Sequence, residues 1–305
     1  MTYPIIKIKN YDEIEQIGTK EKFWFYDEQN RVRKLFKIGR SGTGENWAEK
    51  VTSELAHLLN IPCATYDLAK WNHKEGVVSP IFVPQQGRLV HGNEILAKII
   101  ENYPSYQLYK VREYKLSTVL AIMTKLKIKL PIGYNKNTNI QNISDLFIGY
   151  LMFDCWISNP DRHHENWGFV DDVINNSFHL APTYDHASGL GCRISDKERN
   201  ERLKTKDKGY SVAAFVKRAK SAFFDDKKLK QLKTIDVFLV AAKHNPKAAL
   251  FWLNELDNLS QDKIESIFGE VPEHLISNAE INFALAILHE NKIRLVNTKK
   301  GLVND

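Results

Sequence analysis

The hydrophobic pattern of this 305-residue sequence changes near Pro84, and the change divides the chain into two parts. Before Pro84, the runs within 22–38 flank the turn-like "DEQN" and predict a β-hairpin. The runs "CATYDLAKW" and "GVVSPIFV" predict two more strands, and apolar residues at helical spacing predict a helix over about 45–60. Residues 1–84 are therefore expected to form a small, mainly β unit with one helix.

The sequence after Pro84 is patterned for helices. Apolar spacing and segment length predict helices over 94–102, 114–126, 144–158, 211–224, 227–243, 246–257, 261–268 and 278–290. Prolines and glycines mark several of the gaps between them. Residues 85–305 are therefore expected to form a larger, α-rich unit, with a cleft between the two units where ligands commonly bind.

One polar loop interrupts the helical part between two apolar runs. Its sequence, "NPDRHHENWGF", combines an acid, an amide, two imidazoles and a guanidinium. The preceding helix should end near Pro160, a strand should resume at "WGFV", and a second strand, "FHLAPTYD", is predicted to end in Asp185. Such a hairpin would bring Asp161, Asn166 and Asp185 together.

The chemistry of these three side chains suggests a cation and a phosphate. Carboxylate and amide oxygens are the ligands that hard divalent cations prefer. Phosphoryl transfer needs Mg²⁺ on the phosphates and one carboxylate near the attacking hydroxyl. We therefore predict Asp161 as the base and Asn166 and Asp185 as metal ligands. A single Asp in such a loop is more often a turn or cap residue, so the prediction depends on the three together.

Two motifs carry a resemblance to a known family. "DRHHENWGF", followed by "LAPTYDHAS", resembles the HipA-like serine/threonine kinases, bacterial relatives of the eukaryotic protein kinase fold. Their catalytic loop reads D-x-x-x-x-N, and their metal-binding Asp closes an L-x-P-x-[FY]-D strand. Asp161, Asn166 and Asp185 match these positions in type and order. The resemblance implies an α+β, bilobal protein-kinase-like fold with a β-rich N-lobe (1–84) and an α-helical C-lobe (85–305), and ATP and Mg²⁺ as cofactors.

The N-terminal unit carries further matches to the same family. "IGTKEKFWFY" resembles its phosphate-covering loop, which implies nucleotide contacts from Gly18, Thr19 and Lys20. Lys37 matches the ATP-anchoring lysine and Glu49 the helix glutamate that pairs with it. Two alternatives stay open: Lys37 as a solvated edge charge, and Glu49 as the capping glutamate of "NWAE".

The segment "VVSPIF" resembles the hinge between the lobes of these kinases. Because Pro80 has no N–H, adenine recognition is expected from the Ser79 carbonyl and the Ile81 N–H. The chain resembles the compact branch of the family, without the extra N-terminal subdomain. Longer members carry a regulatory serine where this chain has Glu15, so autophosphorylation there is not expected. Thr19 and Ser41 are the alternative acceptors.

Other polar residues near the loop are assigned supporting roles. "HHEN" is not a zinc motif, so His163 is predicted to support the loop and His164 to be solvated. Asp154, on the apolar helix before the loop, is expected to hydrogen-bond the loop backbone, because a buried acid needs such a partner.

The charge distribution points to anionic partners without selecting one. The net charge is +6, and residues 196–230 hold twelve Lys or Arg residues. This basic stretch is either a solvated surface or a dock for an acidic protein or an RNA-bound substrate. The residues proposed for docking are Arg199, Arg202 and Lys204, at the place where protein kinases carry their activation segment.

The sequence favours a cytoplasmic protein. No stretch approaches the roughly 18 apolar residues of a membrane span, and the N-terminus does not read as a signal peptide. Cys63, Cys155 and Cys192 form no CxxC pair, which argues against a disulfide framework or a zinc module.

The resemblance implies a protein kinase that phosphorylates Ser or Thr. It further implies a toxin role in a bacterial toxin–antitoxin system, with a helix-turn-helix antitoxin as partner and a target in translation. Two alternatives remain at this level. The first is a small-molecule or lipid kinase with the same core, and the second is a non-catalytic nucleotide-binding module that binds DNA or a partner through its basic face.

Overall fold

The structure is a computed structural model that describes residues 2–14, 21–134 and 138–302. Its strands are β1 (Ile6–Ile8), β2 (Glu13–Ile14), β3 (Lys22–Asp27), β4 (Val32–Ile38), β5 (Asp67–Trp71), β6 (Lys74–Pro80), β7 (Arg88–His91), β8 (Gly168–Asp172), β9 (Ser177–Leu180), β10 (Lys220–Phe224) and β11 (Gln231–Lys233). Its helices are α1 (Glu45–Leu58), α2 (Gly92–Ile99), α3 (Leu116–Lys125), α4 (Ile143–Trp156), α5 (Asp196–Lys204), α6 (Val212–Arg218), α7 (Thr234–His244), α8 (Pro246–Asp257), α9 (Gln261–Gly269), α10 (Asn278–Val296) and α11 (Lys299–Leu302).

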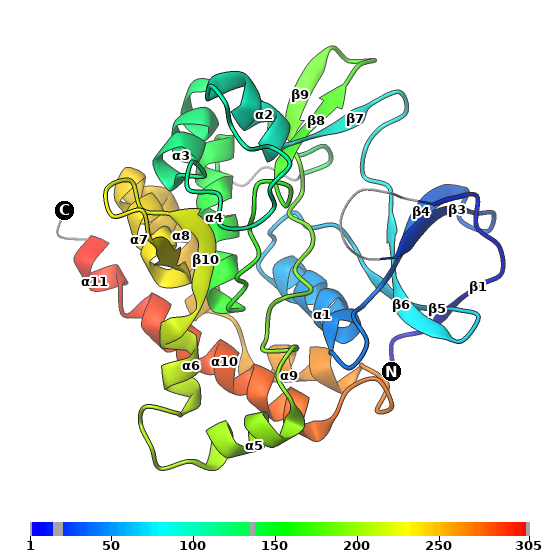
Figure 1. The fold of residues 1–305 in the computed structure, drawn as a ribbon, viewed down its shortest axis with the longest axis vertical. Coiled ribbons are helices and arrows are strands. Elements are labelled where there is room, and N and C mark those ends of the chain that lie inside the picture. The colour runs from blue at the N-terminus through cyan, green and yellow to red at the C-terminus, as the bar shows by residue number, and fades with distance from the viewer. Residues whose placement is uncertain (1, 15–20, 135–137, 303–305) are drawn as a thin grey trace.

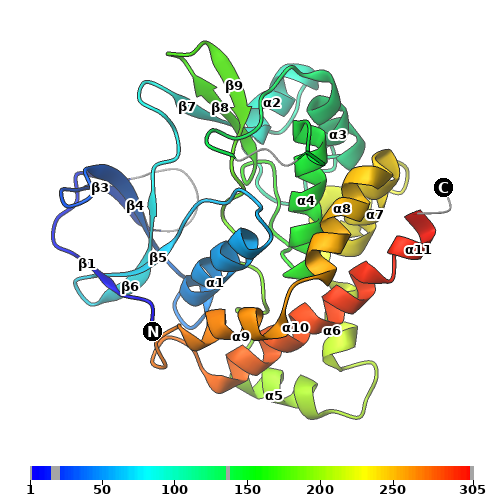
Figure 2. The same cartoon turned by 180° about the vertical axis from the view of Figure 1, so that it is seen from behind.

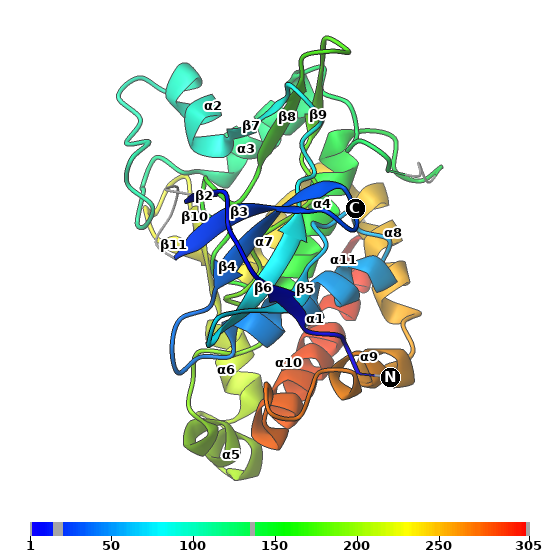
Figure 3. The same cartoon turned by 90° about the vertical axis from the view of Figure 1, so that its right-hand side faces the viewer.

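The first part of the chain forms a six-stranded sheet in the order β1-β5-β6-β4-β3-β2 (Figure 3). The predicted hairpin is confirmed, because β3 and β4 pair antiparallel from Lys22↔Lys37 to Asp27↔Val32. Phe23, Phe25 and Phe36 alternate toward one face, where they form a small core of their own with residues of β1, β5 and β6.

The helix predicted over 45–60 is α1, and it ends two residues early. Asn60 adopts a positive φ of 53°, a conformation that Asn tolerates better than most residues. The N–H groups of Asn60 and Ile61 then donate to the carbonyls of His57 and Ala56, which completes a Schellman end.

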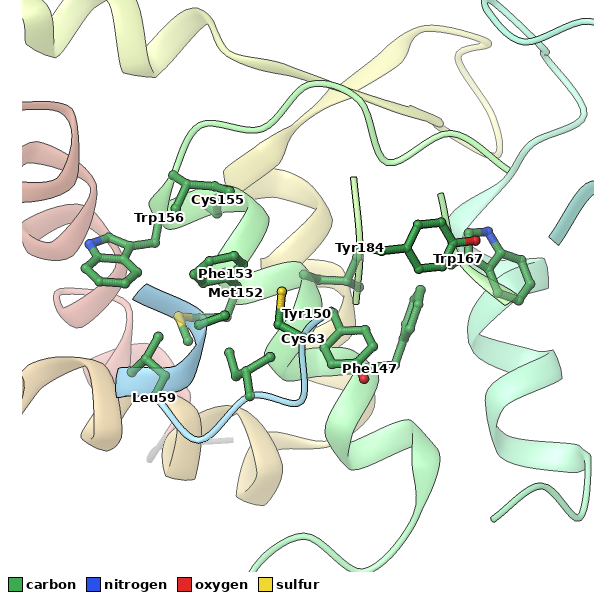
Figure 4. Close-up of a cluster of buried hydrophobic side chains, with 14 of the residues drawn as sticks. Leu59, Cys63, Phe147, Tyr150, Met152, Phe153, Cys155, Trp156, Trp167 and Tyr184 are labelled. Carbon is green, nitrogen blue, oxygen red and sulfur yellow. The ribbon is translucent and has the colours of Figure 1, made fainter. Parts of the chain in front are cut away.

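Helix α4 is the centre of the helical part (Figures 1 and 2). All fourteen of its residues are buried, because it is apolar on every side and contacts α3, α7, α8 and α10. Its aromatic side chains join a large core that includes the labelled residues Phe147, Phe153, Trp156 and Trp167 (Figure 4). Among the described helices, none combines the length and apolar character needed to cross a bilayer.

Three predictions about secondary structure are wrong. The helix predicted over 211–224 ends at Arg218, and β10 begins at Lys220. The strand β11 lies within the first part of the helix predicted over 227–243. These two short strands pair with each other, and such pairing cannot be read from a short apolar run. The strand predicted to end in Asp185 stops at Leu180, where its pairing with β8 ends.

The architecture is the predicted α+β one, with a β-rich N-terminal part and a larger helical part (Figure 1). The first sheet ends at Pro80, and β7, β8 and β9 form a separate sheet of the helical part, in which β8 is the central strand. The boundary at 84/85 lies between these two sheets, and we retain it as the proposed lobe boundary. Cys63, Cys155 and Cys192 are all buried and unbridged.

Candidate active site

A cavity of about 670 Å³ lies between the sheet and the helical part. Its volume is in the range of small-molecule and cofactor sites. Residues from both parts line it, including Leu35, Lys37, Ser79, Asp161, Asn166 and Asp185. The cavity therefore joins the residues that the sequence singled out.

Lys37 is fixed by two carboxylates. Its Nζ lies 2.6 Å from Asp185 Oδ1 and 3.3 Å from Glu49 Oε2, and the residue is only 8% exposed. Burial disfavours the charged form, but the carboxylates of Asp185 and Glu49 outweigh it and raise the pKa of Lys37 well above its ordinary value. Lys37 is thus a buried cation in this site, and the interpretation as a solvated edge charge is wrong.

Glu49 lies one turn inside α1 and is buried. Its second oxygen, Oε1, accepts a hydrogen bond of 2.7 Å from the backbone N–H of His186. The capping alternative is wrong, because the N-cap is Gly44, and Asn46 instead accepts from the N–H of Gly39 at 2.8 Å. Glu49 therefore connects the N-terminal helix to the segment that carries Asp185.

The polar loop is built on a buried ion pair between Asp154 and Arg162. The Nε and Nη2 atoms of Arg162 donate to the two oxygens of Asp154 at 2.7 and 2.8 Å. Asn159 Nδ2 also donates to Asp154, and Arg162 Nη1 donates to the Asn166 carbonyl at 2.7 Å. The Asp154 carboxylate thus binds side chains of the loop rather than the loop backbone that was predicted, and it holds both ends of the loop.

Asp161 and Asn166 face the cavity from this loop. Asn166 Nδ2 donates to the Asp161 carbonyl at 2.6 Å, so the amide nitrogen is engaged within the loop. The side-chain oxygen of Asn166 is the atom that can act as a ligand. The Asp161 carboxylate accepts a hydrogen bond of 2.9 Å from Ser188 Oγ. Both residues line the same cavity as Asp185.

Asp185 reaches the cavity from an irregular segment five residues after β9. Thr183 exchanges backbone hydrogen bonds with the segment after α1, to Pro62 O at 2.8 Å and from the N–H of Ala64 at 2.9 Å. Asp185 itself has a positive φ of 60°, a conformation that is uncommon for residues other than glycine and recurs at functional sites.

The two histidines of the loop are both buried. His163 accepts from the N–H of Glu165 through Nδ1, and its Nε2 lies 3.8 Å from Asp161 Oδ1. His164, which was predicted to be solvated, is 1% exposed, with its Nδ1 2.6 Å from the Tyr103 hydroxyl. Burial lowers the pKa of His164 to about 4, so the ring is neutral near pH 7. Nothing in the sequence of the loop predicts that Tyr103, 61 positions away, packs on His164.

The two backbone groups that were predicted to bind adenine are directed at β4. The Ile81 N–H donates to Arg33 O at 3.0 Å, so β4 occupies the donor that was expected to bind adenine. In an antiparallel ladder every second residue pair is hydrogen-bonded. Because Arg33 and Ile81 form such a pair, Leu35 and Ser79 form the next one, and the backbone groups of Ser79 also point toward β4. The Pro80 carbonyl points away from β4, and the Phe82 N–H has no protein acceptor in the described part of the chain.

Some predicted positions could not be placed or fell elsewhere. Gly18, Thr19 and Lys20 lie outside the described residues. Arg199, proposed for docking, is 4% exposed and forms ion pairs with Asp196 at 2.6 Å and Glu280 at 3.3 Å. It stabilises the packing of α5 on α10 and is not available to a partner.

The sequence did not reveal a network that links α1 to Asp161. Glu45 is fully buried and accepts from Arg40 Nη1 at 2.6 Å and from Arg193 Nε at 2.9 Å. Arg193 Nη2 donates to Ser188 Oγ at 2.5 Å, and Ser188 donates in turn to Asp161. Glu45 and Arg193 are 148 positions apart, so no local motif signals their pairing.

Asn166 and Asp185 are suited to hold a cation. Both place oxygen ligands on the cavity, and Mg²⁺ is commonly bound by one or two such groups together with substrate phosphates. Within the described ranges, no three His, Cys, Asp or Glu side chains cluster as an all-protein metal site. The residues therefore fit a metal that arrives with a nucleotide.

Comparison with known proteins supports the fold. No protein-family model and no curated protein sequence matches the chain. Among solved structures, the chain is similar to the Helicobacter pylori proinflammatory kinase CtkA, with a TM-score of 0.76, 20% identity and 99% of each chain covered. It is also similar to HipA of Shewanella oneidensis MR-1, solved with HipB and operator DNA, with a TM-score of 0.58, 11% identity, and 96% of this chain and 68% of that chain covered. The chain thus has the fold of the HipA-like kinases, as its motifs indicated.

Proposed function

We propose that this protein is an ATP- and Mg²⁺-dependent kinase that transfers the γ-phosphoryl group to a serine or threonine of a protein. The observation that carries the proposal is the convergence of Lys37, Asp161, Asn166 and Asp185 on one cavity of cofactor size. The fold, shared with the kinase CtkA, supports the same reading.

The nucleotide would bind between the sheet and the loop. Lys37, held charged by Glu49 and Asp185, would contact the α- and β-phosphates. We propose that the Pro80 carbonyl and the Phe82 N–H bind the adenine edge in place of Ser79 and Ile81, since both residues line the cavity and these two groups are not directed at β4. Gly18, Thr19 and Lys20 remain the proposed phosphate loop.

In the proposed reaction, the acceptor oxygen forms a bond to the γ-phosphorus as the bond to the β–γ bridging oxygen breaks and ADP leaves. Asp161 would orient the acceptor hydroxyl and take its proton. Mg²⁺, held by Asn166 and Asp185, would supply positive charge to the phosphates. The buried Asp154–Arg162 pair would keep Asp161 and Asn166 at fixed separation.

Incubation of the protein with ATP and Mg²⁺, followed by intact mass and peptide mapping, tests this reaction. We expect phosphorylated serine or threonine on the protein itself or on an added protein acceptor, and none when EDTA removes the metal. Protein and small-molecule acceptors are compared with labelled ATP. Labelling of small molecules alone would favour a small-molecule kinase. Binding of ATP without any phosphoryl transfer would favour the non-catalytic nucleotide-binding module.

The hinge assignment predicts a specific loss with modified nucleotides. 1-Deaza-ATP lacks the ring nitrogen that would accept from the Phe82 N–H, so we expect it to bind about tenfold more weakly than ATP, the effect of one hydrogen bond. 7-Deaza-ATP, altered away from the hinge edge, is the matched control and should bind like ATP. Equal affinity for 1-deaza-ATP and ATP, measured by calorimetry, would refute the assignment.

We also propose a toxin role, in which a helix-turn-helix antitoxin binds the protein and the target belongs to translation. Its support is the resemblance of the motifs and the similarity to HipA, which was solved with HipB and DNA. Expression that arrests growth in the wild type and not in the Lys37→Met variant would agree with this role. Unimpaired growth with active kinase would exclude it.

A further inference from the structure

A second pocket, of about 380 Å³, lies next to Asp161, since the residue before Asp161 and the hydrogen-bond partner of its carboxylate both line it. Pro160 and Ser188 line it, and Ile194 and Phe215 add apolar surface. Three arginines complete it: Arg193, Arg202 and Arg218. Among the described residues that line it, none is acidic. We call it the arginine pocket.

The position of the arginine pocket relates it to the acceptor side of the proposed reaction. Pro160 precedes Asp161 in the chain, and Ser188 Oγ donates to Asp161 Oδ2 at 2.9 Å. Arg193 Nη2 lies 3.9 Å from the same carboxylate. A polypeptide whose hydroxyl approaches Asp161 would therefore bring a neighbouring side chain to this pocket.

The pocket has an excess of positive charge. Arg193 pairs with the buried Glu45, which it shares with Arg40, and lies 3.9 Å from the Asp161 carboxylate. Arg202 pairs with Glu198 at 2.8 Å. Arg218 is exposed, donates to the Gly209 carbonyl at 3.0 Å and has no carboxylate partner within the described ranges. These charges favour an anionic group.

Arg202 is also held in place, by hydrogen bonds to Glu198 and to the Tyr210 carbonyl and by two aromatic rings. The Arg202 guanidinium carbon lies 4.2 Å from the centroid of the Tyr210 ring and 5.2 Å from that of the Phe215 ring, which are cation–π contacts. Planar guanidinium groups bind carboxylates and phosphates through two parallel hydrogen bonds. The apolar wall suits the methylene groups of the side chain that carries the anion.

We propose that the arginine pocket binds an anionic side chain of the protein substrate, an aspartate, glutamate or phosphoserine close to the accepting hydroxyl. The inference rests on the proposed kinase function and names its substrate class. It also revises the docking residues expected from the sequence, because Arg199 is buried and Lys204 does not line the pocket, whereas Arg202 does.

Peptide binding tests the pocket without requiring turnover. The probes are fluorescent peptides with one central serine, flanked by glutamate, phosphoserine or glutamine. We expect the two anionic series to bind at least about tenfold more tightly than the glutamine series, the effect of one charge-assisted interaction. Comparison of glutamate with phosphoserine then separates a carboxylate from a phosphate preference, and either preference supports the pocket.

Two charge reversals on α6 locate the effect. Arg218→Glu should remove most of the anionic preference, and Lys217→Glu, an exposed neighbour outside the pocket with the same change in charge, should retain it. Phosphorylation with labelled ATP then gives kcat/KM for the same peptides. In the Arg218→Glu variant, kcat/KM should fall about tenfold for the anionic peptides only, and the KM for ATP should not change.

The outcomes separate this inference from the kinase proposal. Equal binding of glutamate and glutamine peptides, or equal losses in the two variants, would overturn the pocket while leaving the kinase intact. If the anionic peptides bind more tightly but no acceptor is phosphorylated, the kinase proposal is refuted. Preferential binding of RNA oligonucleotides over all peptides, lost in Arg218→Glu, would also overturn a peptide site.

Discussion

Replacement of Asp161 by asparagine is expected to lower phosphoryl transfer by about 10²–10⁴-fold, the usual contribution of a positioned acid–base group. Asparagine has nearly the same size and still offers an oxygen to Ser188, but it cannot accept the proton of the acceptor hydroxyl. Because Lys37, Glu49 and Asp185 remain in place, nucleotide affinity should change little. Labelled-ATP transfer and calorimetric ATP binding measure the two effects.

Asp262→Asn is the matched control for this variant, since Asp262 is exposed on α9 and lies outside both cavities. It should retain full activity. An Asp161→Asn protein that transfers phosphate at the wild-type rate would remove Asp161 from the mechanism. Loss of ATP binding as well would assign Asp161 a structural role.

Replacement of Asp154 by alanine is expected to lower the free energy of unfolding by about 3–5 kcal/mol, because it leaves the Arg162 cation buried without its partner. It should also abolish activity, since Arg162 would no longer be held against the Asn166 carbonyl. Chemical denaturation measures the first effect and labelled-ATP transfer the second.

A double variant separates stability from activity. Asp154→Leu combined with Arg162→Met removes both charges and fills the space with apolar groups, so much of the lost stability should return. Activity should not return, because the Asn166 carbonyl and the Asn159 side chain lose their partners. A single Asp154→Ala variant of wild-type stability would show that the ion pair does not support the loop.

The sequence was most informative where the structure is local. The helix over 246–257 was predicted with its observed limits, because Pro246 and a regular apolar spacing define it without reference to the rest of the chain. Asp161 and Asn166 could be named for the same reason, since they share one loop between two apolar elements. Their roles in catalysis remain proposals for the experiments above.

The structure was needed wherever a residue depends on a distant partner. The Ile81 N–H points at Arg33 because its segment pairs with β4. A shift of one residue in that register would point the same N–H away from β4. Likewise, the cover of His164 by Tyr103 joins segments 61 positions apart.

The sequence by itself determined the order of the β-rich and helical parts and the residue types of the candidate site, because periodicity and short motifs are properties of neighbouring residues. The tertiary structure alone decided which backbone groups face the cavity and which arginines line the second pocket. Those properties arise from contacts such as Glu45 with Arg193 and Lys37 with Asp185, each spanning 148 positions, and no local pattern encodes such a contact.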